Sequence, residues 1–201
     1  MNIGIPCRWL AQTSSTNDVA REWALAGAPA GALVVAARQN RGRGRRERLW
    51  ESPAGSGLYA SFVWRPSWPA EQASNLAVLA GMAAYGALES LGVPNLRIKW
   101  PNDILSAGRK ICGVLVEPRI GTGRIEFAVA GIGINVRQQR EDFLPDLRDR
   151  ATSCALAGVG VSVDHVLERL VCSWRAVWAM PFEQVRLNWL AAGARDEEPK
   201  L

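Results

Sequence analysis

The sequence is poor in residues that usually hold metals. It contains one histidine, and its four cysteines are widely separated without any C-x-x-C pair. A structural zinc site needs several such ligands at short spacings, so we expect neither zinc nor haem. The single histidine, His165, has no recognisable partner signature for nucleophilic catalysis and is expected on the surface of a helix over residues 163–180.

Long hydrophobic runs are also missing. The longest, residues 24–37 and 76–88, contain glycine and are shorter than the roughly 18–20 residues of a membrane-spanning helix. Residues 1–10 show neither a secretory signal nor a transit pattern. With 48% hydrophobic and 21% charged residues, the chain has the composition of a globular protein. We therefore expect a cytoplasmic protein without membrane association, with one folded domain over residues 1–192 and a polar tail over 193–201.

Lysine is scarce, and the net positive charge falls in one short segment. Only three of the 24 basic residues are lysines, and the net charge of +5 equals the surplus of residues 38–48, where six arginines stand against Glu47. A nucleic-acid-binding protein usually spreads its basic surface over a longer face, so we do not expect a nucleic-acid partner. Arginine forks match carboxylate and phosphate oxygens, and Gly42 and Gly44 permit positive φ and close approach to a ligand. We interpret this arginine loop, residues 38–48, as a segment that orders around an anion, with a solvated basic loop or a nucleic-acid-binding patch as alternatives.

Two of the lysines, Lys99 and Lys110, lie in the middle of the chain. Residues 96–100 alternate apolar and basic side chains, which predicts a strand with Lys99 on its cationic face. The next residue is a proline, which would end this strand and leave Asn102-Asp103 in a turn. A lysine in a chain that otherwise uses arginine suggests a site that needs a compact ammonium group close to one oxygen.

Hydrophobic periodicity predicts the remaining helices and strands. We expect helices over residues 16–26, 69–91, 166–179 and 182–192, the first capped by Ser14, Ser15 or Thr16, and strands over 32–37, 57–64, 96–100, 110–117 and 125–134. The short turns between the last three strands are typical of an antiparallel meander. The predicted class is α+β, a mixed, mainly antiparallel sheet packed by helices.

A glycine motif, Gly131-x-Gly133-x-Asn135, closes the last predicted strand. Its small residues would let another backbone or a flat ring approach, and the asparagine offers donors and acceptors for an adenine or amide edge. The motif lacks the third glycine of a dinucleotide-binding fingerprint. The arginine loop likewise lacks the Gly-Lys-Ser/Thr ending of a Walker A loop.

Together, and in this order, the motifs resemble those of the catalytic domain of biotin protein ligases, which has a class II synthetase-like fold. The resemblance is strong over residues 12–137 and continues weakly to residue 192. The motifs that carry it are Ser15-Thr16-Asn17, Gln39 with Gly42-Arg43-Gly44-Arg45-Arg46 and Trp50, Gly57-Leu58-Tyr59-Ala60-Ser61, Lys99-Trp100-Pro101-Asn102-Asp103, Lys110-x-x-Gly113-Val-Leu-Val-Glu117 and Gly131-x-Gly133-x-Asn135.

The resemblance implies an ATP-dependent enzyme of the biotin-[acetyl-CoA-carboxylase] ligase type. Biotin and ATP, with Mg²⁺ as the ion of the nucleotide, would give biotinyl-5′-AMP and pyrophosphate. A lysine of a biotin carboxyl carrier protein would then take the biotinyl group. Because a carboxylate attacks an α-phosphate in the first step, cations are needed to stabilise the charge of the transition state.

The resemblance also implies a role for each residue of these motifs. Lys99 and Arg45 would be catalytic. Substrate contacts would come from Ser15, Thr16, Asn17 and Gln39 at the ureido end of biotin, and from Gly42, Arg43, Gly44, Arg45, Lys110 and Gly113. Nucleotide contacts would come from Arg46, Arg48, Trp50, Asn102 and Asn135, and Mg²⁺ would be held by Asn102 and Asp103. The arginine loop would fold across the biotinyl-adenylate and shield it from water.

Three departures from the family pattern bear on these expectations. A small β-barrel domain usually follows the last helices, and it would not fit after residue 192. Residues 1–14 are too few for the N-terminal DNA-binding domain of some members, so a repressor role is not expected. Glu47 stands where the loop usually continues with glycine, which makes the loop stiffer and less positive.

Three alternative functions stay open at this point. They are a lipoate ligase or octanoyltransferase, a non-catalytic binder of biotin or biotinyl-adenylate, and a basic-loop nucleic-acid binder. The oligomeric state is open as well, with a homodimer among the options.

Overall fold

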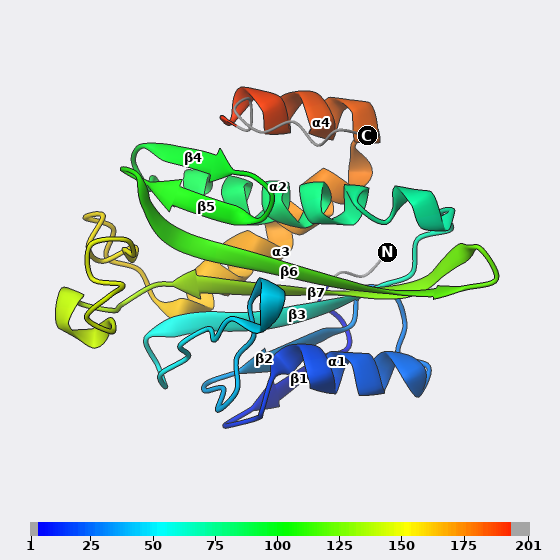
Figure 1. Ribbon diagram of the computed structural model, residues 1–201, viewed down its shortest axis with the longest axis horizontal. Coiled ribbons are helices and arrows are strands. Elements are labelled where there is room, and N and C mark those ends of the chain that lie inside the picture. The colour runs from blue at the N-terminus through cyan, green and yellow to red at the C-terminus, as the bar shows by residue number, and fades with distance from the viewer. Residues whose placement is uncertain (1–3, 194–201) are drawn as a thin grey trace. The chain divides into compact units, whose positions relative to one another are not determined.

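The computed structural model describes residues 4–193, and Figure 1 shows its helices and strands. Along the chain these are β1 (Cys7–Leu10), α1 (Thr16–Leu25), β2 (Leu33–Ala36), β3 (Gly57–Trp64), α2 (Asn75–Ser90), β4 (Leu96–Lys99), β5 (Asp103–Ser106), β6 (Arg109–Gly121), β7 (Arg124–Asn135), α3 (Val163–Ala179) and α4 (Phe182–Ala191). Short 3-10 helices lie at Arg45–Glu47, Ala70–Gln72 and Arg140–Asp142. Within residues 4–193, none of the helices combines the length and the apolarity needed to cross a membrane.

The strands form a mixed sheet in the order β1-β2-β3-β7-β6-β5-β4. The edge pair β1–β2 is parallel, while the pairs β2–β3, β4–β5 and β5–β6 are antiparallel. A parallel pair needs a crossover between its strands, and α1 supplies it. The α+β class and the mainly antiparallel sheet that the sequence predicts are confirmed.

The chain folds as two compact units, and each is described by itself. The first contains the residues up to Ala77 together with Val114–Gly133, and the second contains Val78–Gly113 together with the residues from Ile134 onward. The chain passes from one unit to the other inside α2, inside β6 and inside β7.

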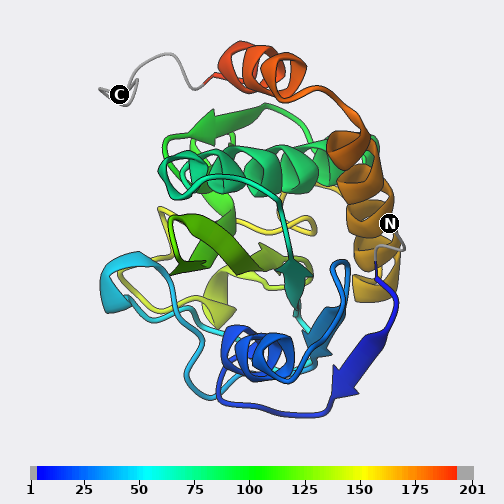
Figure 2. The same cartoon turned by 90° about the vertical axis from the view of Figure 1, so that its right-hand side faces the viewer.

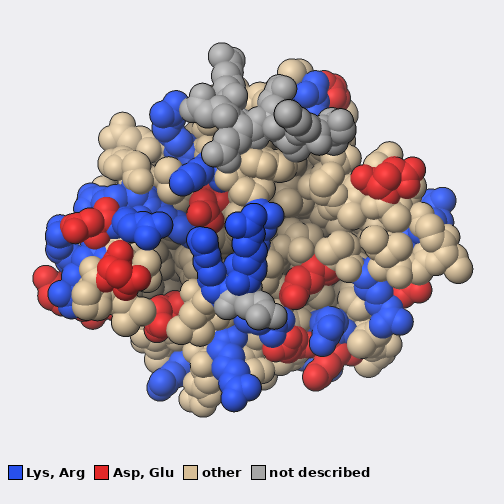
Figure 3. Space-filling model, viewed as in Figure 1, with Lys and Arg blue, Asp and Glu red and all other residues tan. Residues whose placement is uncertain are grey.

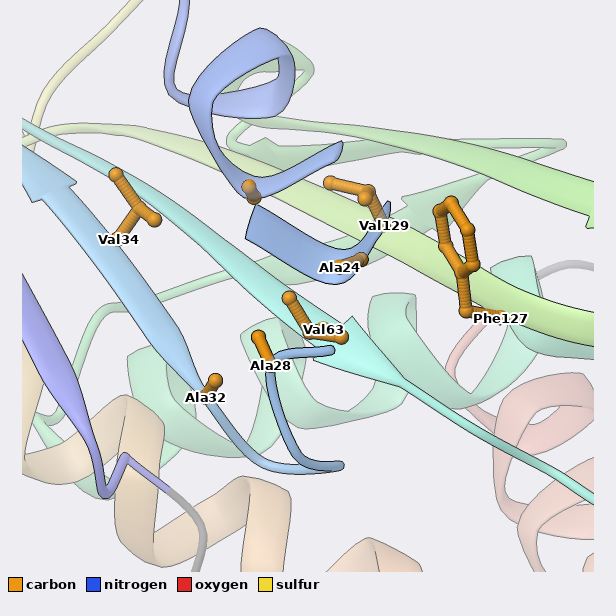
Figure 4. Close-up of a cluster of buried hydrophobic side chains, with 8 residues drawn as sticks. Ala24, Ala28, Ala32, Val34, Val63, Phe127 and Val129 are labelled. Carbon is orange, nitrogen blue, oxygen red and sulfur yellow. The ribbon is translucent and has the colours of Figure 1, made fainter. Parts of the chain in front are cut away.

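In the first unit, α1 packs on β2 and β3 (Figures 1 and 2). The alanines of α1 make this contact. Ala20 and Ala24 lie one turn apart on the same face of the helix and are both buried. Their small side chains let the helix come close to the strands, where they join a cluster of Ala28, Ala32, Val34, Val63, Phe127 and Val129 (Figure 4). This packing fixes the N-terminus of α1, which carries the first set of candidate site residues.

In the second unit, a glycine brings α2 and α4 close together. A Cβ atom added to Gly81 of α2 would collide with Cζ3 of Trp189 in α4 and lie 2.8 Å from its Cη2. The Trp189 ring also packs edge-on against Trp100, with ring centroids 6.2 Å apart. The residue that directly follows Lys99 is therefore held in place by α4. On α3, apolar side chains are buried along one side, namely Val166, Leu167, Leu170, Trp174 and Val177.

The elements differ from the prediction in a few places. β1 and β5 were not predicted. They have four residues each, as do the predicted β2 and β4, but they show neither the continuous apolar run of β2 nor the apolar–basic alternation of β4. The second helix begins at Asn75 rather than at Pro69, since Ala70–Gln72 forms a separate 3-10 turn. Asn102 lies in a turn as predicted, but Asp103 opens β5. The tail predicted from residue 193 lies outside the described residues apart from Gly193, and the domain boundary at residue 192 stays a prediction.

Candidate functional site

A group of buried polar side chains surrounds the N-terminus of α1 in the first unit. Ser15, Thr16 and Asn17 are each less than 5% exposed. Ser15 occupies the N-cap position, but its hydroxyl makes no capping hydrogen bond to the helix. The Gln39 side chain takes this role instead, because the backbone N–H of Thr16 donates to its Oε1 at 2.8 Å. The four residues that the resemblance assigns to the ureido end of biotin therefore belong to one unit, and two of them are in direct contact.

Ser61 of β3 joins this polar group and was not predicted as a site residue. Its Oγ lies 2.7 Å from Oγ1 of Thr16 and 2.6 Å from Oδ1 of Asn17, and the residue is fully buried. The Thr16 hydroxyl lies 3.0 Å from Oε1 of Gln39, and the Gln39 amide donates to Ser52 Oγ at 2.9 Å. The signal for Ser61 is present in the sequence, since it is a serine inside a predicted strand whose neighbours Ala60 and Phe62 are apolar.

We call these residues, Ser15, Thr16, Asn17, Gln39 and Ser61, the polar group. The two hydroxyls of Thr16 and Ser61 supply two protons for three oxygen–oxygen contacts of 2.6 to 3.0 Å. The polar group is thus rich in acceptors. Chemically, it can receive a ligand that brings N–H donors.

The arginine loop begins beside this polar group. Gly42 fits there only because it lacks a side chain: an added Cβ would collide with the Trp50 carbonyl oxygen and lie 2.7 Å from Ser52 Oγ. Gly42 and Gly44 do not use the positive φ that glycine permits; the left-handed residue of the loop is Arg46, with φ of 54°. The close approach expected at Gly42 exists, but the neighbour is the chain itself.

The first arginine after Gly42 is bound within the protein. Arg43 donates two hydrogen bonds to the Asp18 carboxylate, at 2.8 and 2.7 Å, and its Nη2 lies 3.5 Å from Oε1 of Glu117. The hydrogen bond to Asp18 is the main reason that the pKa of Arg43 is raised above its ordinary value. Neither carboxylate was among the predicted site residues, although Asp18 directly follows the Ser-Thr-Asn motif and Glu117 ends another motif.

The outer part of the loop carries exposed cations. Arg45, Arg46 and Arg48 are exposed, whereas Arg43 is half-buried. The backbone of the loop closes on itself, because Gly44 N–H donates to the Arg48 carbonyl at 2.7 Å. Figure 3 shows Lys and Arg side chains gathered near the centre of one face, with Asp and Glu side chains beside them. The outer arginines are in a position to reach an anionic ligand in solution.

The glycines of the Gly131-x-Gly133 motif make close contacts in the first unit. A Cβ on Gly133 would lie 2.5 Å from Cε2 of the Trp50 ring, and one on Gly131 would collide with Oδ1 of Asn17. The flat ring that the sequence suggested for this position is thus Trp50 of the chain itself. The motif keeps room for Trp50 and for a member of the polar group.

In the second unit, two lysines flank one carboxylate. Lys110 Nζ forms an ion pair with Oδ1 of Asp103 at 2.6 Å. Lys99 is exposed on β4, as predicted, and is the register partner of Asp103 on β5. Gly113 of β6 pairs with Asp103 on the other side. The unpredicted strand β5 therefore brings the Lys99 and Lys110 motifs together around Asp103.

Asn135 lies in a second buried polar network of this unit. Its Nδ2 donates to the Thr152 carbonyl at 2.9 Å, and its Oδ1 accepts from Gln138 Nε2 at 3.3 Å. Ser153 Oγ donates to the Gln138 carbonyl at 2.6 Å. The backbone of Lys110 is tied to the same segment, since its carbonyl accepts from the Thr152 N–H at 2.8 Å. The Gly131-x-Gly133-x-Asn135 motif pointed to Asn135, but no sequence pattern signalled its partners Gln138, Thr152 and Ser153, because they lie in an irregular segment.

The remaining side chains considered as metal ligands or nucleophiles are the histidine and the cysteines. His165 is exposed on α3, as predicted. Residues 4–193 contain no cluster of three His, Cys, Asp or Glu side chains that could hold a metal ion. The four cysteines are free, with Cys7 and Cys172 exposed and Cys112 and Cys154 buried.

The sequence matches the model of the biotin/lipoate A/B protein ligase family over residues 9–135, so the chain belongs to this family. It is 38% identical over 182 residues to the bifunctional ligase/repressor BirA of Bacillus spizizenii, a match that covers 88% of this chain and 56% of that protein. It is 34% identical over 198 residues to the biotin-[acetyl-CoA-carboxylase] ligase of Paracoccus denitrificans, covering 94% of this chain and 82% of that protein. The chain spans about half the length of the bacterial ligase/repressors that it matches.

Solved structures of biotin protein ligases share the fold. The ligase from Aquifex aeolicus in complex with biotin and ATP superposes with a TM-score of 0.78 at 28% sequence identity, covering 93% of this chain and 78% of that one. The ligase from Leishmania major in complex with biotinyl-5-AMP gives a TM-score of 0.75 at 26% identity, covering 97% of this chain and 84% of that one.

Proposed function

We propose that the protein activates biotin with ATP as biotinyl-5′-AMP and then transfers the biotinyl group to a lysine of a biotin carboxyl carrier protein. Its family and its likeness to ligase structures that hold biotin with ATP, or biotinyl-5-AMP, support this proposal. The observation that carries it is the buried polar group at the start of α1, from which the arginine loop extends. Hydrogen-bonding groups for a polar ring and cations for anionic oxygens thus occur in one unit.

The polar group would bind the ureido end of biotin. A ureido ring offers two N–H donors and a carbonyl acceptor, and the acceptor-rich arrangement of Thr16, Asn17 and Gln39 matches the donors. The Ser15 hydroxyl, which makes no capping bond, would donate to the carbonyl. Ordering of these groups before the ligand arrives lowers the entropy lost on binding.

The cations would act in the adenylation step. Arg45, Arg46 and Arg48 would neutralise carboxylate and phosphate oxygens, with Arg45 closing over the reacting centre. Lys99 would stabilise charge on the α-phosphate, and Lys110 with Gly113 would contact the acyl linkage. The loop would then exclude water from the mixed anhydride.

The nucleotide contacts that the resemblance implies are Trp50 in the first unit and, separately, Asn102 and Asn135 in the second, and Mg²⁺ would be bound mainly by the phosphates. The Asp103 carboxylate already pairs with Lys110, and the described residues hold no cluster of acidic or imidazole ligands. One carboxylate beside Asn102 fits an ion that keeps its waters and phosphate oxygens rather than a resident metal. When bound, the ion would offset phosphate charge during attack. The carrier protein, a homodimer and a cytoplasmic location stay predictions.

The proposal is tested by mass spectrometry of the acceptor. The protein is incubated with ATP, Mg²⁺, biotin and a biotin carboxyl carrier domain, and the intact mass of the carrier is measured. We expect one biotinyl increment, which is lost when ATP is omitted or when the acceptor lysine is replaced. A lipoyl or octanoyl increment in parallel reactions, with none from biotin, would contradict the proposal. Pyrophosphate release without any carrier product would restrict the protein to the first step.

A further inference from the structure

The Glu117 carboxylate contacts side chains from two different segments of the first unit. Its Oε2 accepts from Nδ2 of Asn17 at 2.6 Å, and its Oε1 lies 3.5 Å from Nη2 of Arg43. A carboxylate has acceptors on both oxygens, so it can serve both donors at once. Glu117 thus links a member of the polar group to the base of the arginine loop.

Asp18 holds the same guanidinium from the first turn of α1. The two hydrogen bonds from Arg43 are parallel and short, at 2.8 and 2.7 Å, and form a bidentate pair. The side chains of Arg43 and Asp18 are 35% and 28% exposed, so the pair is partly shielded from water. Such a pair holds better than an ordinary exposed ion pair, which contributes little.

The outer arginines of the loop are more exposed than Arg43. Arg45, Arg46 and Arg48 are exposed, and the loop backbone returns to the protein at Trp50, whose N–H donates to the Gly42 carbonyl at 2.8 Å. The arginine loop therefore has a fixed base at Gly42 and Arg43 and an outer part with free surface.

We propose that Asp18 and Glu117 are positioning residues that act through Arg43. Asp18 fixes the base of the arginine loop to α1 and Glu117 fixes it to β6, while Glu117 also orients the amide of Asn17. Contact with the anionic ligand then falls to the outer arginines, which move about a fixed base. The identity of the ligand that the loop closes over rests on the function proposed above. The anchor, which consists of the contacts of Asp18 and Glu117 with Arg43, exists without any ligand.

Limited digestion with trypsin tests the anchor directly, because trypsin cleaves after arginine and needs an open segment. The ligand-free protein and the variants Asp18→Asn and Glu117→Gln are digested, and cleavage within residues 43–48 is followed by intact mass. We expect cleavage to be about 3- to 10-fold faster in both variants, because cleavage follows the population of the open loop. Asp18→Glu keeps a carboxylate and should restore most of the protection. Glu22→Gln removes an exposed charge from the same helix and is the matched control.

A kinetic measurement separates positioning from general structural damage. Glu117→Gln keeps only one acceptor for two donors, so the orientation of Asn17 should suffer. We expect the KM for biotin to rise about 5- to 20-fold with kcat changed less than about 3-fold. The thermal midpoint of each variant shows whether it is folded.

The outcomes distinguish the inference from the proposed function. Wild-type cleavage rates in folded Asp18→Asn and Glu117→Gln would overturn the anchor, as would equal acceleration in Glu22→Gln. If the two variants are cleaved faster while neither they nor the wild type biotinylate a carrier, the anchor stands and the proposed function fails. If Asp18→Asn does not fold, the cleavage rates of Asp18→Glu and Glu117→Gln are compared. The anchor then requires faster cleavage in Glu117→Gln than in Asp18→Glu.

Discussion

At the scale of single residues, the lysines of the second unit have different surroundings. Lys110 of β6 is paired with Asp103 at 2.6 Å, while Lys99 is exposed on β4, on the other side of β5. A paired ammonium has part of its charge neutralised. Lys99 is therefore the stronger candidate for stabilising charge that develops during a reaction.

Replacing Lys99 should separate catalysis from binding. We expect Lys99→Ala to lower the rate of biotin-dependent pyrophosphate release by about 100-fold or more, because the charge it stabilises exists only in the transition state. The Kd for biotin should change less than about 3-fold. Arg97→Ala, which removes the other cation from the same strand face, is the control. Equal losses of rate and affinity in Lys99→Ala would remove Lys99 from the catalytic role.

Most residues of the polar group could be predicted from sequence, but their connections could not. Ser15, Thr16, Asn17 and Gln39 belong to recognisable motifs, and the structure gathers Thr16, Asn17 and Gln39 into one hydrogen-bonded network. Ser61 lies 45 positions along the sequence from Thr16 and 44 positions from Asn17. Such contacts depend on the packing of α1 against β3, which local periodicity does not report.

At the scale of elements, the arginine loop should control the lifetime of the intermediate. Replacing the exposed Arg45 by glycine removes one cation that would lie over the adenylate and adds backbone freedom. We expect Arg45→Gly to release the adenylate about 10-fold faster. The measurement is biotinylation of bystander lysines on an unrelated protein, detected with streptavidin. If the variant labels bystanders no more than the wild type, the loop does not retain the intermediate.

The contact between α2 and α4 gives a prediction about stability. Gly81→Ala would drive a Cβ into the Trp189 ring, and we expect a loss of about 1–3 kcal/mol in the free energy of unfolding, although alanine favours the helix. Gly160→Ala is the control, because a Cβ there meets nothing within 4 Å. Denaturant titration measures both. A Gly81→Ala variant at least as stable as the wild type would show that the helices do not pack this closely.

Strands were predictable where their residues show a clear pattern, either a continuous apolar run or an alternation of apolar and basic side chains. β3 spans eight consecutive buried residues and was predicted with its observed bounds. β1 has four residues, most of them exposed, and is held by its pairing with β2. For β1, the pairing with β2 supplies the stabilisation, so the local sequence gives little sign of the strand.

At the scale of the whole molecule, alkaline pH should weaken the fold through Tyr59. Burial raises the pKa of this tyrosine to about 12, and its hydroxyl donates to the Pro53 carbonyl at 3.0 Å. In the unfolded chain the phenol ionises near pH 10. The unfolded state therefore loses the proton first as pH rises, so the contribution of Tyr59 is complete below about pH 10 and is lost toward pH 12.

The variant Tyr59→Phe isolates this effect. Between about pH 10 and 12 the wild type should lose about 2 kcal/mol more unfolding free energy than Tyr59→Phe, since phenylalanine has no proton to release. At neutral pH the variant should be about 1 kcal/mol less stable, because the hydrogen bond to Pro53 is gone. Chemical denaturation across this pH range provides the comparison. Parallel pH profiles for the two proteins would exclude Tyr59 as the source.

The three points where the chain passes between its units fall inside α2, β6 and β7 rather than in loops. Neither half is encoded by one uninterrupted stretch of gene, so a fragment that ends after residue 77 or 113 would stop in mid-helix or mid-strand. A two-piece reporter made from this protein should be divided in a surface turn, such as the one at Thr122 and Gly123 between β6 and β7.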